Sequence, residues 1–153
     1  MKPILFLSCL AVLAGCGSDK LDYVIENEAG KTVIKDGNLY HEGTDGTKSS
    51  LTTETVTEDD IGLPFYPKSQ LDDDSLKLAE NGAITIALAV RKTSDSEQQV
   101  RAFYEGRLGA PTSEITELGN TNLLWVKPPK KYSLETWVKD NATHFRVGFS
   151  LKE

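Results

Sequence analysis

"AITIALAVRKTSDSEQQVRAFYEGRLG", residues 83–109, contains two hydrophobic periods in direct succession. The apolar residues of its first part alternate along the chain and share one face: Ile84, Ile86, Leu88 and Val90. This period of two predicts a strand, whose other face carries small residues such as Ala87 and Ala89. From residue 97 the spacing changes to three and four, which predicts a helix over residues 97–108. The small residues leave room for an element packed on the strand.

Both ends of the predicted helix carry recognisable signals. Ser94 with Glu97 fits a capping box, and Asp95 is an alternative cap one residue later. The helix places one apolar stripe on the core: Val100, Phe103, Tyr104 and Leu108. Gly109 is the expected stop, with Pro111 just beyond it.

The rest of this region predicts strands. Asn81-Gly82 favours a two-residue hairpin turn between residues 75–80 and 83–91. Further strands are expected over residues 115–118, 123–127, 132–139 and 143–151. The order strand-strand-helix-strand-strand-strand-strand predicts an α+β fold, an antiparallel sheet with one packed helix.

A weakly apolar segment precedes this fold. Asp36-Gly37 is a strong hairpin signal, and residues 23–57 predict a small β-meander that leans on the later domain. We therefore expect four regions: residues 1–15, a signal peptide; 16–22, a tether; 23–57, the meander; and 58–153, the α+β domain.

The leading segment has the layout of a secretory signal. Lys2 is followed by an apolar run that ends near Leu13, too short for the roughly 20 residues of a membrane-spanning helix. Small residues and Cys16 follow. Cys9 lies in the apolar run and is expected to be discarded with it.

Residues 13–16, Leu-Ala-Gly-Cys, resemble the lipobox of bacterial lipoproteins. The resemblance implies that Cys16 receives lipid, including palmitate, and becomes the first residue of the mature chain. It also implies attachment to a membrane, and Gly17 after the cysteine implies the outer membrane, facing the periplasm.

Two further motifs resemble a small domain found in exported bacterial proteins and lipoproteins. They are Leu63-Pro-Phe-Tyr-Pro and the later Thr93-x-Asp-Ser-x-x-x-Val-x-x-Phe-Tyr. The resemblance implies the fold and the exported address, and it transfers no catalytic residue. Lys68-Ser69 stands where that domain has Gly-Ala, so the turn there is expected to differ.

No reaction is predicted from the residues. His41 and His144 lie far apart and lack the spacing of a metal site, so both are expected to be solvated or packing histidines. Asp72-Asp-Asp74 lacks the spacing of a calcium loop and predicts a solvated turn. The net charge of −6, without a Lys/Arg block, excludes nucleic acid as a partner. We assign no catalytic residue, cofactor or metal.

Four aromatic residues are candidates for an interaction patch: Phe65, Tyr66, Trp125 and Trp137. The alternative for Phe65 and Tyr66 is a buried connector at the core edge, and for the tryptophans a place in the core.

The leading hypothesis is a non-enzymatic binding or accessory lipoprotein of the cell envelope, with the membrane and an envelope protein as partners. One alternative is an inhibitor or immunity lipoprotein directed at an envelope hydrolase or toxin. The other is a hydrolase whose site the sequence does not reveal.

Overall fold

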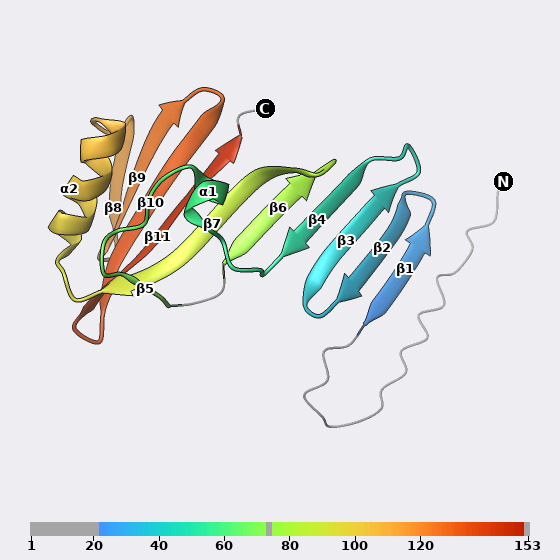
Figure 1. The fold of residues 1–153 in the computed structure, drawn as a ribbon, viewed down its shortest axis with the longest axis horizontal. Coiled ribbons are helices and arrows are strands. Elements are labelled where there is room, and N and C mark those ends of the chain that lie inside the picture. Colours follow the sequence, from blue (N-terminus) through green and yellow to red (C-terminus); the bar gives the residue numbers. More distant parts are fainter. Residues whose placement is uncertain (1–21, 73–74, 152–153) are drawn as a thin grey trace.

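The computed structural model describes residues 22–72 and 75–151, and the predicted signal peptide with most of the tether lies outside them. The described chain forms one antiparallel sheet of eleven strands (Figure 1). Ten strands follow the order β1-β2-β3-β4-β6-β7-β11-β10-β9-β8, and β5 pairs with β7. The strands are β1 (Tyr23–Asn27), β2 (Gly30–Lys35), β3 (Asn38–Gly43), β4 (Lys48–Thr52), β5 (Gln70–Leu71), β6 (Leu76–Glu80), β7 (Ala83–Thr93), β8 (Ser113–Glu117), β9 (Asn120–Lys127), β10 (Lys130–Lys139) and β11 (Ala142–Leu151). The helices are α1 (Glu58–Ile61) and α2 (Glu97–Leu108).

Local turn chemistry explains most of the antiparallel pairing. Four hairpins close through two residues that both have positive φ, the conformation of the hairpin turns that match strand twist. These turns are Asp36-Gly37, Asn81-Gly82, Leu118-Gly119 and Asp140-Asn141. Three of these turns consist only of Asn, Asp or Gly residues, which tolerate this conformation. The turn at Leu118-Gly119 instead places a leucine at its first position.

The predicted helix is confirmed as α2, with a different cap. Ser96, not Ser94 or Asp95, is the N-cap residue, and it forms a capping box with Gln99. Gly109 ends the helix as expected, at a φ of 77°. Since Val100, Tyr104 and Leu108 are all buried, the apolar stripe faces the sheet.

The core lies between the helices and one face of the sheet, which we call the front face. Ala87 and Ala89 of β7 are fully buried there, as their small size allows. On β11 the same face carries Phe145, Val147 and Phe149, all buried. The fold is sheet-dominated, with α2 as the packed helix of an α+β arrangement.

The connector between β4 and β6 also covers the front face. It contains α1, which the sequence analysis did not predict, although Thr57 and Asp60 form a capping box. Val56 and Ile61 are buried in the core cluster. The Lys77 ammonium of β6 meets the Asp60 carboxylate at 2.8 Å, which ties α1 to the sheet.

One prediction about β7 is wrong. A register shift between β6 and β7 at Leu78/Ala79 leaves Ile86 opposite Leu78 and brings Ile84 opposite Ala79. The extra residue turns Ile84 to the front face, where it packs against the core cluster. Ile84 therefore does not share a face with Ile86 and Leu88.

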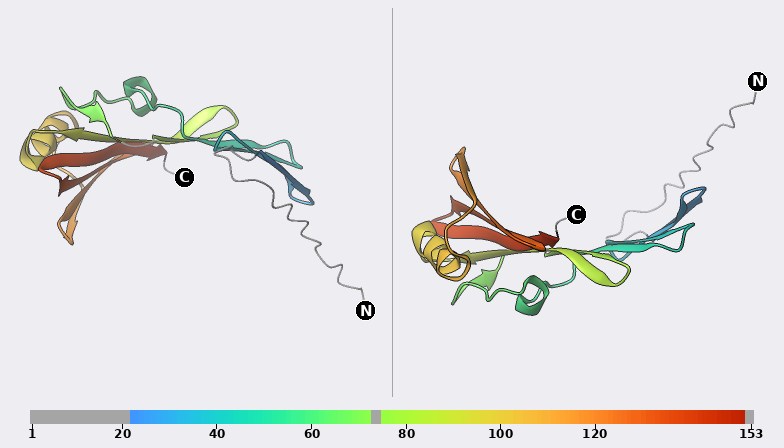
Figure 2. Two further views of the ribbon diagram at one scale, coloured as in Figure 1. Left: turned by 90° about the horizontal axis from the view of Figure 1, so that it is seen from below. Right: turned by 90° about the horizontal axis from the view of Figure 1, so that it is seen from above.

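The meander continues the sheet instead of packing on it. β4 pairs with β6 from Ser49↔Glu80 to Thr52↔Lys77, so β1 to β4 extend the sheet edge to edge. Seen along the sheet, these strands form a single layer, while α1 and the connector lie over the other half (Figure 2). Within the described residues, the second face of the sheet, here called the back face, carries no helix.

Candidate interaction surfaces

Phe65 and Tyr66 serve as a half-buried connector. The Tyr66 ring packs edge-on against Phe103 of α2 and Phe145 of β11, with centroids 5.3 and 6.3 Å apart. Its hydroxyl donates a hydrogen bond of 2.7 Å to Asp95, and this bond, together with burial, raises the pKa of Tyr66. Tyr66 therefore joins the connector to the start of α2.

Phe65 covers a half-buried arginine. The Arg91 guanidinium lies 4.1 Å from the centre of the Phe65 ring. It also donates hydrogen bonds of 2.8 Å to the side chain and to the carbonyl of Ser69. Lys68, just before, has a φ of 63°. The turn thus keeps the conformation that a glycine would favour, with a lysine in its place.

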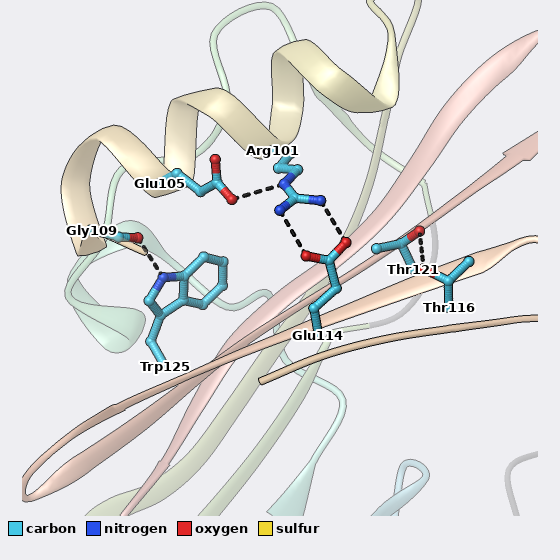
Figure 3. Close-up of polar contacts among 7 residues, drawn as sticks. All are labelled: Arg101, Glu105, Gly109, Glu114, Thr116, Thr121 and Trp125. Atoms are coloured by element: carbon cyan, nitrogen blue, oxygen red, sulfur yellow. Dashed lines mark hydrogen bonds and ion pairs between the residues drawn. The ribbon is translucent and has the colours of Figure 1, made fainter. Parts of the chain in front are cut away.

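Trp125 lies in the core and not on the surface, with 1% of its area exposed. Its indole N–H donates a 2.8 Å hydrogen bond to the carbonyl of Gly109, at the end of α2 (Figure 3). That bond satisfies a carbonyl that the end of a helix leaves without a partner. Trp125 therefore fixes the helix on the sheet.

A second group of polar contacts holds β8 to α2 (Figure 3). The Arg101 guanidinium binds both oxygens of Glu114, at 2.6 and 2.8 Å, and its Nε donates to Glu105 at 2.8 Å. These carboxylates raise the pKa of Arg101, and the arginine lowers that of Glu114. The bidentate geometry positions an edge strand against the helix.

Trp137 lies on the back face, apart from the other three aromatic residues. Its ring stacks on His144 at 5.8 Å and 21°. His144 is a packing histidine whose Nδ1 lies 2.5 Å from the Asp72 carboxylate, and Lys92 meets the same carboxylate at 3.0 Å. Burial disfavours the charged carboxylate, but these two partners outweigh it and lower the pKa of Asp72.

Asp72 therefore corrects one expectation. Instead of a solvated turn residue, its carboxylate is largely enclosed and anchors the connector to the sheet. Asp73 and Asp74 lie outside the described residues. The other histidine, His41, pairs with the Thr32 hydroxyl at 2.9 Å, far along the sheet from His144.

The back face carries an apolar row that the sequence analysis missed. Each member lies directly opposite the next across neighbouring strands, from β1 to β7. The row consists of Tyr23, Ile34, Leu39, Leu51, Leu78 and Ile86. We call it the back-face row. Its members are half-buried or exposed, and no described element covers them.

A hollow of about 430 Å³ lies on the front face of the meander. Its lining includes Val33, Tyr40 and Ala79, which belong to neighbouring strands, together with charged groups from Lys31 and Glu42. Glu42 forms an ion pair of 3.6 Å with Lys48 and lies directly opposite Lys31 in the β2–β3 register. The hollow is shallow.

The described residues contain no cluster of metal-binding side chains and no helix that could span a membrane. Among residues 22–72 and 75–151, no three His, Cys, Asp or Glu side chains gather closely enough to bind a metal ion. No helix in this part of the chain is long and apolar enough to span a membrane. Comparison with protein-family models, curated proteins and solved structures gives no match.

Proposed function

We propose that the protein is a lipid-anchored binding module of the bacterial cell envelope, without enzymatic activity. Cys16 carries the lipid, residues 16–22 form the tether, and the described sheet is the binding part. The anchor places the module at the outer membrane, facing the periplasm. The back-face row is the observation that supports a binding role.

The size of the row favours a protein partner. Neighbouring strands lie about 4.8 Å apart, so a row across six strands extends for roughly 24 Å. Contiguous apolar surface of this kind usually marks a contact with another protein or a ligand. α2 and the connector cover the front face only over the second half of the sheet, whereas the back-face row runs uncovered from the meander to β7 and is the longer line of apolar side chains.

Two neighbouring residues offer a matched test of this surface. Leu51 on β4 belongs to the row, whereas Tyr40 on β3 points to the front face, and their exposed fractions are 36% and 41%. A photo-crosslinking amino acid at position 51 should capture an envelope protein in living cells. The same group at position 40 should capture it at least tenfold less.

The outcome separates the candidate functions. Equal capture from both positions, or none from position 51, would contradict a binding role for the back face. Capture of a hydrolase or toxin that the purified protein inhibits would favour the inhibitor or immunity function.

The anchor has its own test, independent of the binding surface. Cys16→Ala should abolish labelling with radioactive palmitate and leave the precursor uncut, because only the thiolate accepts lipid. Ser18→Ala is a suitable control, because Ser18 lies two residues beyond Cys16. Labelling that persists in Cys16→Ala would refute the anchor without affecting the argument for the back-face row.

A further inference from the structure

The edge of the sheet formed by β1 is open and apolar. β1 pairs with β2 on one side, and no other described strand lies beyond it. Tyr23, Val24 and Ile25 are 51%, 62% and 53% exposed. Natural proteins usually protect such an edge with charges, proline or a bulge, because its free backbone groups pair readily with another strand.

The hairpins show which backbone groups of β1 are free. In the two-residue turn between β2 and β3, Lys35 and Asn38 form the closing hydrogen-bonded pair. The backbone N–H and C=O groups of successive residues point to opposite sides of a strand. Because Lys35 bonds to β3, its neighbour Ile34 points its N–H and C=O groups at Tyr23 of β1. Tyr23 and Ile25 thus bond to β2, and Val24 and Glu26 direct their N–H and C=O groups outward.

We propose that β1 pairs with β1 of a second copy of this chain, antiparallel and with the two-fold axis at Val24. In this register Val24 faces Val24 of the second copy, and Tyr23 faces its Ile25. All three exposed apolar residues then gain an apolar neighbour, and the outward groups of Val24 exchange two hydrogen bonds across the axis.

The neighbouring register is less favourable. With the axis at Ile25, Val24 would lie opposite a charged Glu26, and Tyr23 would lie opposite Asn27. The register at Val24 also joins apolar side chains on the front faces of the two copies, since Val24 lies beside Val33, and Val33 beside Tyr40.

The opposite edge of the sheet does not fit β1 as well. β8, the strand at that edge, carries Glu114, which is bound to Arg101, and it ends at Glu117. Glu26 of β1 would approach these acids in a head-to-tail pairing. The two-fold pairing also sets Glu26 opposite Asp22 of the second copy, but both lie exposed at the ends of the contact. That pairing closes the edge and stops at two copies, whereas a head-to-tail contact has no such stop.

The two-fold arrangement also suits two anchored copies, a step that rests on the proposed function. The two Tyr23 residues would be offset by two positions, which is about 7 Å along the strand. Both tethers then start from nearly the same point and can reach one membrane. Confinement to that membrane raises the effective concentration of the copies.

A proline substitution tests the pairing without breaking the monomer. Val24→Pro removes an N–H that points away from β2, so the β1–β2 bonds remain. Val24→Thr keeps that N–H and is the matched control. Sedimentation of the full-length protein in detergent should show a concentration-dependent dimer for wild type and Val24→Thr, and a folded monomer for Val24→Pro.

Cysteine substitutions test the register. Opposed residues of a hydrogen-bonded antiparallel pair have Cα atoms about 5.5 Å apart, within the range that a disulfide spans. Val24→Cys should therefore oxidise to a dimer at least tenfold faster than Ile25→Cys or Ile115→Cys, the last being on β8 and equally exposed at 53%. The unsubstituted chain measures any background from Cys16.

Three results would overturn the proposal: a wild-type protein that stays monomeric, a Val24→Pro variant that still dimerises, or open-ended polymers. Faster oxidation of Ile25→Cys than of Val24→Cys would overturn the register at Val24. None of these measurements depends on lipid at Cys16, so the anchor can fail or hold independently.

Discussion

Gly148 allows β11 and β7 to lie close together at the centre of the sheet. A Cβ atom added there would collide with the backbone carbonyl oxygen of Ala87 and would lie 2.5 Å from Cδ2 of Leu88. Carbon atoms in contact are ordinarily 3.5–4.0 Å apart, so more than about 1 Å must be regained. Leu88 can swing away over the uncovered back face, but Ala87 is part of a central strand and cannot.

We therefore expect Gly148→Ala to lower the free energy of unfolding by about 2–3 kcal/mol, the upper part of the usual range for overpacking. Gly106→Ala is the matched control: nothing lies within 4 Å of a Cβ atom at Gly106, inside α2. There alanine should stabilise the protein by about 0.5–1 kcal/mol, because glycine is costly within a helix.

Urea unfolding followed by tryptophan fluorescence measures both variants, since Trp125 and Trp137 report on the two faces of the sheet. The dependence on urea should keep its slope, so that the shift in midpoint reflects stability alone. A Gly148→Ala variant within about 0.5 kcal/mol of wild type would refute the close approach of β7 and β11, because surface substitutions away from such contacts lie in that interval.

Three further outcomes follow from single side chains. The buried Tyr104 hydroxyl makes no hydrogen bond of good geometry among the described residues, only a weak contact with the Tyr66 backbone, so Tyr104→Phe should raise the free energy of unfolding by about 1 kcal/mol, measured by urea unfolding. Leu118 is fully exposed at a φ of 52°, so Leu118→Asn should raise the melting temperature, because asparagine tolerates this conformation better than leucine. The pKa of Asp72 is lowered from the ordinary 3.8. Its contribution to the free energy of unfolding is therefore fully present above pH 3.8 and is lost as the pH falls below that value. Asp72→Asn should therefore flatten the loss of stability below about pH 4, and an unchanged acid limb would contradict the contacts with His144 and Lys92.

Features encoded locally were predictable from the sequence. The helix over residues 97–108, its end at Gly109 and the turns at Asp36-Gly37 and Asn81-Gly82 depend on residues within a few positions of one another. The cap of α2 shows the limit of this reasoning. Both Ser94 and Ser96 have a Glu or Gln three residues later, and the structure selects Ser96 while Asp95 accepts a hydrogen bond from distant Tyr66.

The candidate surface was harder to predict because it depends on strand register. Leu51 meets Leu78 only because β4 pairs with β6 across the whole connector. Likewise, His144 and Asp72 are 72 positions apart. The aromatic residues were visible in the sequence, but their faces were not: Trp125 turned out to be a core residue, and Trp137 lies on the opposite face. Apolar pairs such as Val33-Ile34 and Leu39-Tyr40 were the features of the sequence that could have indicated the back-face row.

The place of β11 has a consequence for the order of folding. It lies between β7 and β10, yet it is the last of the described strands to be synthesised. Before residues 142–151 arrive, β1 to β7 and β8 to β10 share no strand and present two open edges to each other. A chain cut before Ala142 would leave these halves unjoined, so the sheet cannot close until β11 has been made. The two open edges are therefore most exposed to wrong pairing just before the last ten described residues emerge from the ribosome.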